Sequence, residues 1–134
     1  MPRASILLAD DNSAVLTHVS KMLEKDYDIV GAVRGGASVL LDWPRLKPDV
    51  IVLDISMGET NGIDVARHLR DSGCDSKIVF LTVHEDPDYV KAAMGAGGSG
   101  YVLKTRLGSD LGSAIHAVLS GKLFVSASLL YEGS

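Results

Sequence analysis

Cysteine is nearly absent from this sequence, since Cys74 is the only one among 134 residues. One cysteine excludes an internal disulfide framework and fits a reducing compartment. No apolar run reaches the roughly 18 residues that a membrane-spanning helix requires. Residues 1–4 lead into a short apolar run with acidic residues behind it, which is unlike a secretory signal. These absences predict a cytoplasmic protein with no membrane partner.

Clusters of basic residues are also lacking. The chain has 13 Lys and Arg against 17 Asp and Glu, a formal net charge of −4. A domain that binds the phosphate backbone of a nucleic acid needs Lys and Arg grouped on one surface. Direct DNA binding by this chain alone is therefore not expected. The length leaves room for one domain with one core.

Short apolar runs in the sequence each end at a polar residue. Such runs, without polar alternation, are typical of strands buried on both faces of a parallel sheet that helices cover. A weaker run covers residues 27–33. The stronger runs and the residues that follow them are 6–9 with Asp10 and Asp11, 50–53 with Asp54, 78–81 with Thr82, and 100–103 with Lys104.

The segments between these runs have the apolar spacing of helices. The last is the clearest, with apolar residues recurring at helical spacing from Leu111 to Leu119. Pro44 is expected to help end a shorter second helix. Five strands that alternate with five helices predict an α/β fold of right-handed βαβ units, a doubly wound parallel sheet. The expected helix caps are Asn12 or Ser13, Asn61, and Asp86 followed by Pro87.

The polar residues that end the runs are expected to share one edge of this sheet, because ligands of such folds bind at the carboxyl ends of the strands. Asp10, Asp11 and Asp54 would repel one another without a cation. Oxygen ligands favour a hard divalent ion such as Mg²⁺, which binds together with phosphate oxygens. Lys104 and Thr82 could contact a phosphoryl group, and Asp54 could act as its nucleophile.

Each of these residues has a simpler interpretation by itself. An Asp at a strand end often only caps the next helix, as Asp10 and Asp11 could. Thr82 is β-branched and could merely complete a strand, and a single lysine such as Lys104 is most often solvated. The occurrence of all of them, each at the end of a different run, favours a functional site.

These motifs together resemble the receiver domain of two-component response regulators. The resemblance implies a flavodoxin-like (βα)5 fold with strand order 2-1-3-4-5 over residues 4–121, a signalling module and not an enzyme. It also implies a sensor histidine kinase as partner and homodimer formation on phosphorylation. The segments that carry it are 8–12, 53–57, 61–63, 80–82 and 97–104.

The resemblance implies a role for each matching residue. Asp54 matches the phosphoacceptor. Asp10, Asp11 and Asp54, with the backbone carbonyl of Ser56, match the ligands of Mg²⁺, for which Mn²⁺ is the alternative ion.

A second group of positions matches the phosphoryl contacts and the switch of the family. Thr82 and Lys104 match the residues that bind the phosphoryl group, and Thr82 and Tyr101 match the switch. Tyr101 has a simpler interpretation as a core aromatic.

The segments 100–104 and 121–126 are similar to the nitrate-regulator (LuxR-type) subfamily, whose members usually carry a C-terminal DNA-binding domain. Residues 122–134 are too few for that domain and are expected to form a tail or the start of a linker. DNA contact is therefore expected only through an output domain that this sequence does not contain.

His84 and Thr105 are two of the positions that differ from the usual family pattern. His84 lies two residues after Thr82, and we hypothesise that it changes, with Ser56, the lifetime of the phosphorylated state. Lys104 is followed by Thr105 instead of the usual proline, so a trans peptide bond is expected there.

Two other functions remain as alternatives. One is an interaction module with the same fold that stands alone or signals without phosphate. The other is an aspartyl-phosphate phosphatase of the haloacid dehalogenase type. Asp54-Ile55-Ser56 fits the phosphatase poorly, because that family has a second acid two residues after the nucleophile.

Overall fold

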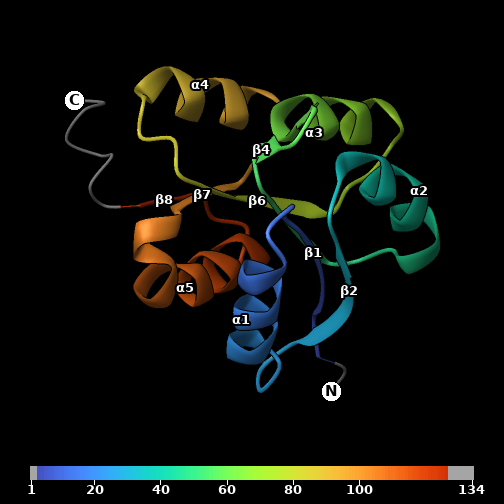
Figure 1. Ribbon diagram of the computed structural model, residues 1–134, viewed down its shortest axis with the longest axis vertical. Coiled ribbons are helices and arrows are strands. Elements are labelled where there is room, and N and C mark those ends of the chain that lie inside the picture. The colour runs from blue at the N-terminus through green and yellow to red at the C-terminus, as the bar shows by residue number, and fades with distance from the viewer. Residues whose placement is uncertain (1–2, 127–134) are drawn as a thin grey trace.

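The computed structural model of the chain describes residues 3–126. A parallel sheet lies at its centre, with helices on both faces (Figure 1). Its strands, in the order in which they lie side by side, are β2 (Asp28–Val33), β1 (Ser5–Ala9), β3 (Val50–Leu53), β6 (Lys77–Thr82), β7 (Gly100–Leu103) and β8 (Phe124–Val125).

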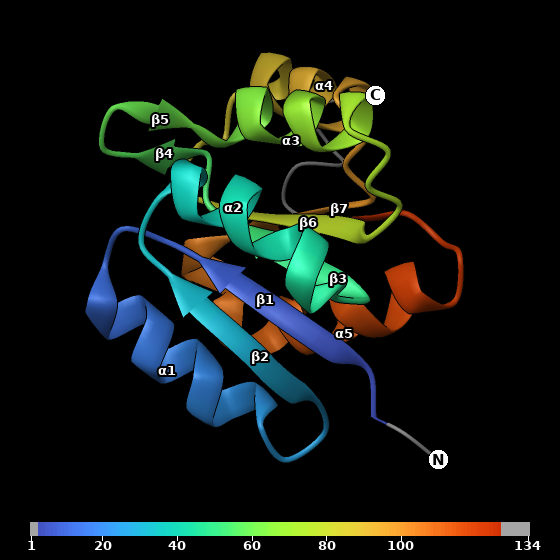
Figure 2. The ribbon, with the colours of Figure 1, turned by 90° about the vertical axis from the view of Figure 1, so that its right-hand side faces the viewer.

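The helices form one layer on each face of the sheet (Figure 2). On one face lie α1 (Ser13–Leu23) and α5 (Leu107–Leu119), the latter preceded by the short 3₁₀ turn η1 (Lys104–Arg106). On the other face lie α2 (Gly36–Leu46), α3 (Gly62–Asp71) and α4 (Pro87–Gly95). A small antiparallel hairpin, β4 (Ser56–Met57) and β5 (Thr60–Asn61), connects β3 to α3.

Successive residues of the central strands enter different cores. Ile6 and Leu8 pack toward α1 and α5, whereas Leu7 and Ala9 pack toward α2, α3 and α4. This alternation explains why the strands read as unbroken apolar runs, because both of their faces are removed from water. No helix within residues 3–126 is long and apolar enough to cross a membrane.

The predicted flavodoxin-like fold is confirmed. The five predicted strands correspond to β1, β2, β3, β6 and β7, and their order in the sheet is the expected 2-1-3-4-5. The structure adds a sixth strand, because β8 pairs in parallel with β7. The sheet therefore reaches Val125, inside the segment expected to be a tail. Residues 127–134 of that segment lie outside the described residues.

Three helix starts agree with the sequence. The side chain of Asn12 accepts a hydrogen bond from the Ala14 amide at 2.9 Å at the start of α1. Asn61 caps α3 and Asp86 caps α4 in the same way. Each cap satisfies an amide that has no partner inside its helix.

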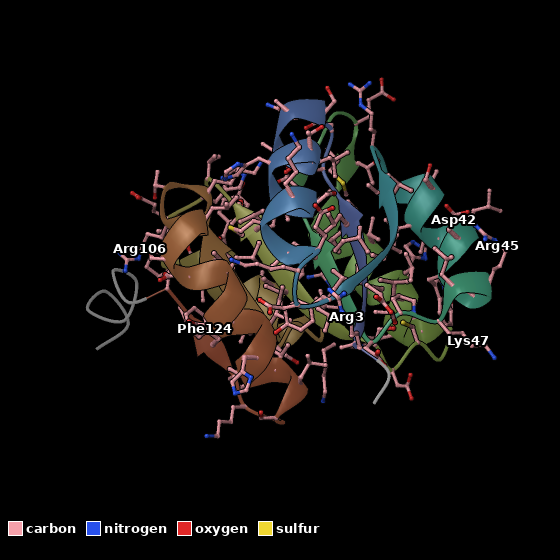
Figure 3. The ribbon with its side chains drawn as sticks, turned by 90° about the horizontal axis from the view of Figure 1, so that it is seen from below. Arg3, Asp42, Arg45, Lys47, Arg106 and Phe124 are labelled. Atoms are coloured by element: carbon pink, nitrogen blue, oxygen red, sulfur yellow. The ribbon has the colours of Figure 1, made fainter. Side chains whose placement is uncertain are left out.

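The predicted end of the second helix is wrong. Pro44 lies inside α2, which continues to Leu46 and is as long as α1 at 11 residues. Pro44 removes one hydrogen bond of the helix, yet the helix continues for two more residues. The helix ends instead at Leu46, and the next residue, Lys47 (labelled in Figure 3), has a left-handed backbone (φ 44) that turns the chain away.

Candidate functional site

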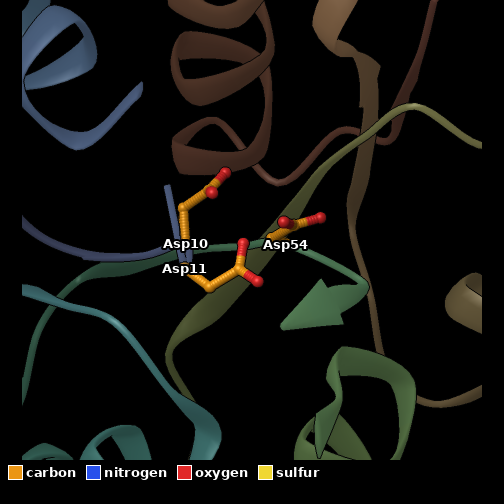
Figure 4. Close-up of side chains that lie close together, drawn as sticks. All are labelled: Asp10, Asp11 and Asp54. Carbon is orange, nitrogen blue, oxygen red and sulfur yellow. The ribbon is translucent and has the colours of Figure 1, made fainter. Parts of the chain in front are cut away.

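Three carboxylates meet at the carboxyl edge of the sheet (Figure 4). Ala9 pairs with Leu53, so the residues that follow them, Asp10 and Asp54, leave adjacent strands side by side. One carboxylate oxygen from each of Asp10, Asp11 and Asp54 lies within 4.8 Å of the others. Asp10 and Asp54 are only 2% and 3% exposed, whereas Asp11 is exposed.

Lys104 is the cation of this cluster. Its Nζ lies 2.8 Å from Asp10 Oδ2 and 3.1 Å from Asp54 Oδ2. Burial lowers the pKa of Lys104, but its close contacts with the Asp10 and Asp54 carboxylates and their charges outweigh burial, so the pKa lies above its ordinary value. Three carboxylates against one ammonium leave two negative charges, which is the charge that a divalent cation would balance.

The pKa of Asp54 lies above its ordinary value. Burial is the largest cause, and the charge of Asp10 adds to it. Lys104 and the amide of Ser56, which donates to Asp54 Oδ1 at 3.2 Å, act in the opposite direction without cancelling the shift. The ionised Asp54 carboxylate is therefore held in an environment that opposes its charge.

The residues present fit a hard cation. Asp10 Oδ2 is buried and makes no hydrogen bond within residues 3–126; its close contact is the ion pair with Lys104 Nζ at 2.8 Å. Ser56 begins the hairpin that follows Asp54, and its amide donates a hydrogen bond to Asp54 Oδ1. All these ligand atoms are oxygen, which suits Mg²⁺ or Mn²⁺.

Asp54→Asn should stabilise the metal-free protein at neutral pH. A carboxylate with a raised folded-state pKa costs stability above that pKa, and the cost disappears as falling pH protonates the group. Because Lys104 keeps Asp10 as a partner, we expect thermal melts to show a Tm rise of about 3 °C, for roughly 1 kcal/mol. The gain should shrink in acid. The exposed Asp75→Asn is the matched control, and a lower Tm for Asp54→Asn would contradict the argument.

Thr82 and Tyr101 lie beside this cluster on neighbouring strands, and both are 0% exposed. Thr82 Oγ1 accepts a hydrogen bond from the amide of His84 at 3.2 Å. The Tyr101 hydroxyl donates to the backbone carbonyl of His84 at 2.8 Å, and burial raises the pKa of this hydroxyl. The loop after β6 is thus held by both side chains.

The imidazole of His84 connects two loops above the sheet edge. Its Nε2 lies 2.8 Å from Ser56 Oγ, in the loop that follows Asp54. Its ring stacks on Tyr89 of α4, with centroids 4.1 Å apart and planes 7° from parallel. His84 therefore contacts both the loop after β3 and the start of α4.

Comparison with known proteins agrees with this geometry. Residues 6–116 match the family described as the response regulator receiver domain. The chain belongs to this family. The phosphatase alternative thereby loses its support, and the receiver domain is understood as a signalling module.

The relatives of this chain include a transcriptional regulatory protein and a nitrate/nitrite response regulator. The chain is 34% identical over 130 residues to the transcriptional regulatory protein DesR of Bacillus subtilis, a match that covers 96% of this chain and 64% of DesR. It is 31% identical over 128 residues to the nitrate/nitrite response regulator protein NarL of Escherichia coli K12, covering 94% of this chain and 59% of NarL. The receiver domain thus spans less than two thirds of these relatives.

Solved structures share the fold closely. A LuxR-family response regulator from Aurantimonas superposes with a TM-score of 0.92 at 28% identity, covering 97% of this chain and 94% of that one. The isolated receiver domain of RcsB from Salmonella enterica, solved with the phosphomimetic BeF₃⁻, superposes with a TM-score of 0.88 at 26% identity. The match covers 96% of this chain and 97% of that one. RcsB in a complex with DNA also matches, with a TM-score of 0.88 at 27% identity. This match covers 96% of this chain and 66% of the RcsB chain.

The structure brings together every residue that the sequence placed at the site: Asp10, Asp11, Asp54, Ser56, Thr82, His84, Tyr101 and Lys104. The Lys104–Thr105 bond is trans, as no cis peptide bond occurs within residues 3–126.

Two residues near the site were not assigned a role from the sequence. A Cβ atom on Gly62 would collide with the carbonyl oxygen of Asp54, so only glycine lets α3 begin this close to it. The guanidinium of Arg34 donates to the carbonyl of Asp11 at 3.1 Å and 3.3 Å. A glycine directly after the capping residue Asn61 was visible in the sequence and could have drawn attention to Gly62. Nothing in the sequence around Arg34 indicated its contact with Asp11, because that contact depends on the tertiary fold.

Proposed function

We propose that Asp54 accepts a phosphoryl group from a sensor histidine kinase. The observation that carries this proposal is the position of Asp54, buried among two other carboxylates and 3.1 Å from Lys104. Asp10, Asp11, Asp54 and the carbonyl of Ser56 would hold Mg²⁺, with Mn²⁺ as the alternative. Such an ion supplies charge neutralisation for the phosphoryl oxygens.

The chemistry of the chain's own residues is an in-line transfer. A carboxylate oxygen of Asp54 forms a bond to phosphorus while the bond from phosphorus to the donor nitrogen breaks, and the donor imidazole keeps the electron pair and takes up a proton. The product is an acyl phosphate. Lys104 binds a phosphoryl oxygen through charge, and the Thr82 hydroxyl donates to another.

The switch follows from a change in local charge. A phosphoryl group on Asp54 carries roughly −1.5 to −2 charges and replaces the single charge of the free carboxylate. Thr82 would then turn its hydroxyl toward the phosphoryl group and pull the loop that carries His84, to which Tyr101 is already bonded. The face of the molecule beside α4 and β7 would change as a result.

A mass measurement tests this function. The protein is incubated with Mg²⁺ and acetyl phosphate and weighed intact. We expect one phosphoryl adduct on the wild type, none on Asp54→Asn, and none without a divalent ion. An equal adduct on both proteins would overturn the proposal. A phosphate-independent interaction module would show no adduct and need not bind Mg²⁺.

His84→Ala is expected to shorten the lifetime of the phosphorylated state. We infer that the bond between the imidazole and Ser56 Oγ covers one approach to Asp54, so that its loss admits water. We expect the acyl phosphate to hydrolyse about fivefold faster. The rate is measured as the loss of the phosphoryl adduct after the phosphodonor is removed. Ser56→Ala should act in the same direction, and the exposed His18→Ala should not. An unchanged or longer lifetime for His84→Ala would contradict the idea.

The output of the switch is proposed to lie outside this chain. The relatives are about one and a half times as long, and RcsB has been solved bound to DNA. A DNA-binding domain attached beyond residue 134, controlled by phosphorylation and by dimer formation through the receiver, would explain this relationship. DNA contact by the receiver itself is not proposed.

A further inference from the structure

Strand β8 lies on the outer edge of β7, outside the matched family region of residues 6–116 (Figures 1 and 3). The amide of Phe124 donates to the carbonyl of Ser99 at 3.0 Å, and the amide of Ser126 donates to the carbonyl of Tyr101 at 2.9 Å. Phe124 packs toward α5 and Val125 toward α4, so this short strand contacts both cores.

Ser126 is a fully buried polar residue at 0% exposure. Its Oγ accepts a hydrogen bond from the amide of Leu103 at 3.1 Å. Leu103 directly precedes Lys104, so Ser126 holds the backbone of β7 at two points, at Tyr101 and one residue before Lys104. The first point is the proposed switch residue, and the second directly precedes the residue proposed to contact the phosphoryl group.

A buried carboxylate supports this connection. Asp110 of α5 is 7% exposed and lies 2.9 Å from Arg106 Nε. Burial alone would raise the pKa of Asp110, but hydrogen bonds from Arg106, Ser126 and Ser109 outweigh it and lower the pKa. Ser126 thus holds the Leu103 amide of β7 and favours the ionised form of Asp110 near the start of α5.

We propose that Ser126 is a positioning residue, and that binding at the Asp54 site and docking of β8 on β7 stabilise each other. The proposal rests on the phosphoacceptor function of Asp54. When Lys104 is drawn to a phosphoryl group, the end of β7 is fixed, and the carbonyl of Tyr101 and amide of Leu103 become better partners for Ser126. The coupling is reciprocal by thermodynamic necessity.

The position of Tyr101 sets the direction of the effect. In this structure Tyr101 is buried with its hydroxyl on the His84 carbonyl, and β8 is docked at the same time. Ligands that favour this arrangement should therefore tighten β8.

Amide hydrogen exchange on the wild type tests the coupling without any substitution. The probe is Mg²⁺ with beryllofluoride, a phosphoryl mimic. We expect the amides of Phe124 and Ser126 to exchange at least about fivefold more slowly when the probe is bound. Unchanged exchange at both amides, with the probe bound, would overturn the proposal.

The reciprocal measurement uses Ser126→Ala, which should weaken binding of the same probe about fivefold. Ser113→Ala, an exposed serine of α5, is the matched control and should bind as the wild type does. Equal affinities for all three proteins would also overturn the proposal while leaving the function of Asp54 intact. A wild type that does not bind the probe would overturn both.

Discussion

Lys104→Ala should slow phosphoryl transfer to Asp54 by about 10²–10³-fold, the usual cost of removing one preorganised group that stabilises charge in a transition state. Lys104 Nζ already lies between Asp10 and Asp54, at 2.8 Å and 3.1 Å, and is therefore in place for the incoming phosphoryl oxygens. The rate is measured with saturating Mg²⁺ and acetyl phosphate by following the adduct in the intact protein.

The control for this prediction is Lys91→Ala, because Lys91 is exposed on α4. Circular dichroism and Mg²⁺ titration should show that Lys104→Ala is folded and still binds the ion. A transfer rate within about twofold of the wild type, with the fold retained, would mean that Lys104 does not take part in the transition state.

Arg70→Ala should cost about 3 kcal/mol of stability, equivalent to a Tm lower by about 10 °C. The half-buried guanidinium donates to the carbonyls of Cys74 and Ser76 at 2.8 Å each and of Gly97 at 2.7 Å. It thereby joins the loop after α3 to the loop after α4. Its loss leaves carbonyl oxygens without a charged partner at both loops.

Urea denaturation measures this cost, and the same helix supplies the control. Arg67 is exposed and pairs with Asp64 one turn away, so Arg67→Ala should change the free energy of unfolding by less than about 0.5 kcal/mol. Equal costs for Arg67→Ala and Arg70→Ala would contradict the structural role of Arg70.

Much of the site could be predicted because a parallel sheet makes its position a matter of topology. Asp10, Asp54, Thr82 and Lys104 each follow an apolar run, and parallel strands bring such positions to one edge. The register between Ala9 and Leu53, and between Thr82 and Leu103, is what places them together. No detail of side-chain packing was needed for this part of the prediction.

Features that depend on tertiary contacts could not be predicted. Strand β8 consists of Phe124 and Val125, which is too short for any periodicity, and it exists because the edge of β7 is open to it. The bond between His84 and Ser56 joins residues 28 positions apart in two loops. Helix α2 continues past Pro44 and ends where Lys47 adopts a left-handed backbone, which its sequence does not indicate.

The central claim is that Asp54 carries the phosphoryl group, and chemical trapping tests it most directly. Borohydride reduces an acyl phosphate to an alcohol, and sequencing of the peptides by mass spectrometry then locates the modified acid. The expected result is one reduced residue, at position 54, in protein treated with Mg²⁺ and acetyl phosphate. Reduction at Asp10 or Asp11 instead, or a borohydride-resistant phosphate on Ser56 or His84, would contradict the claim.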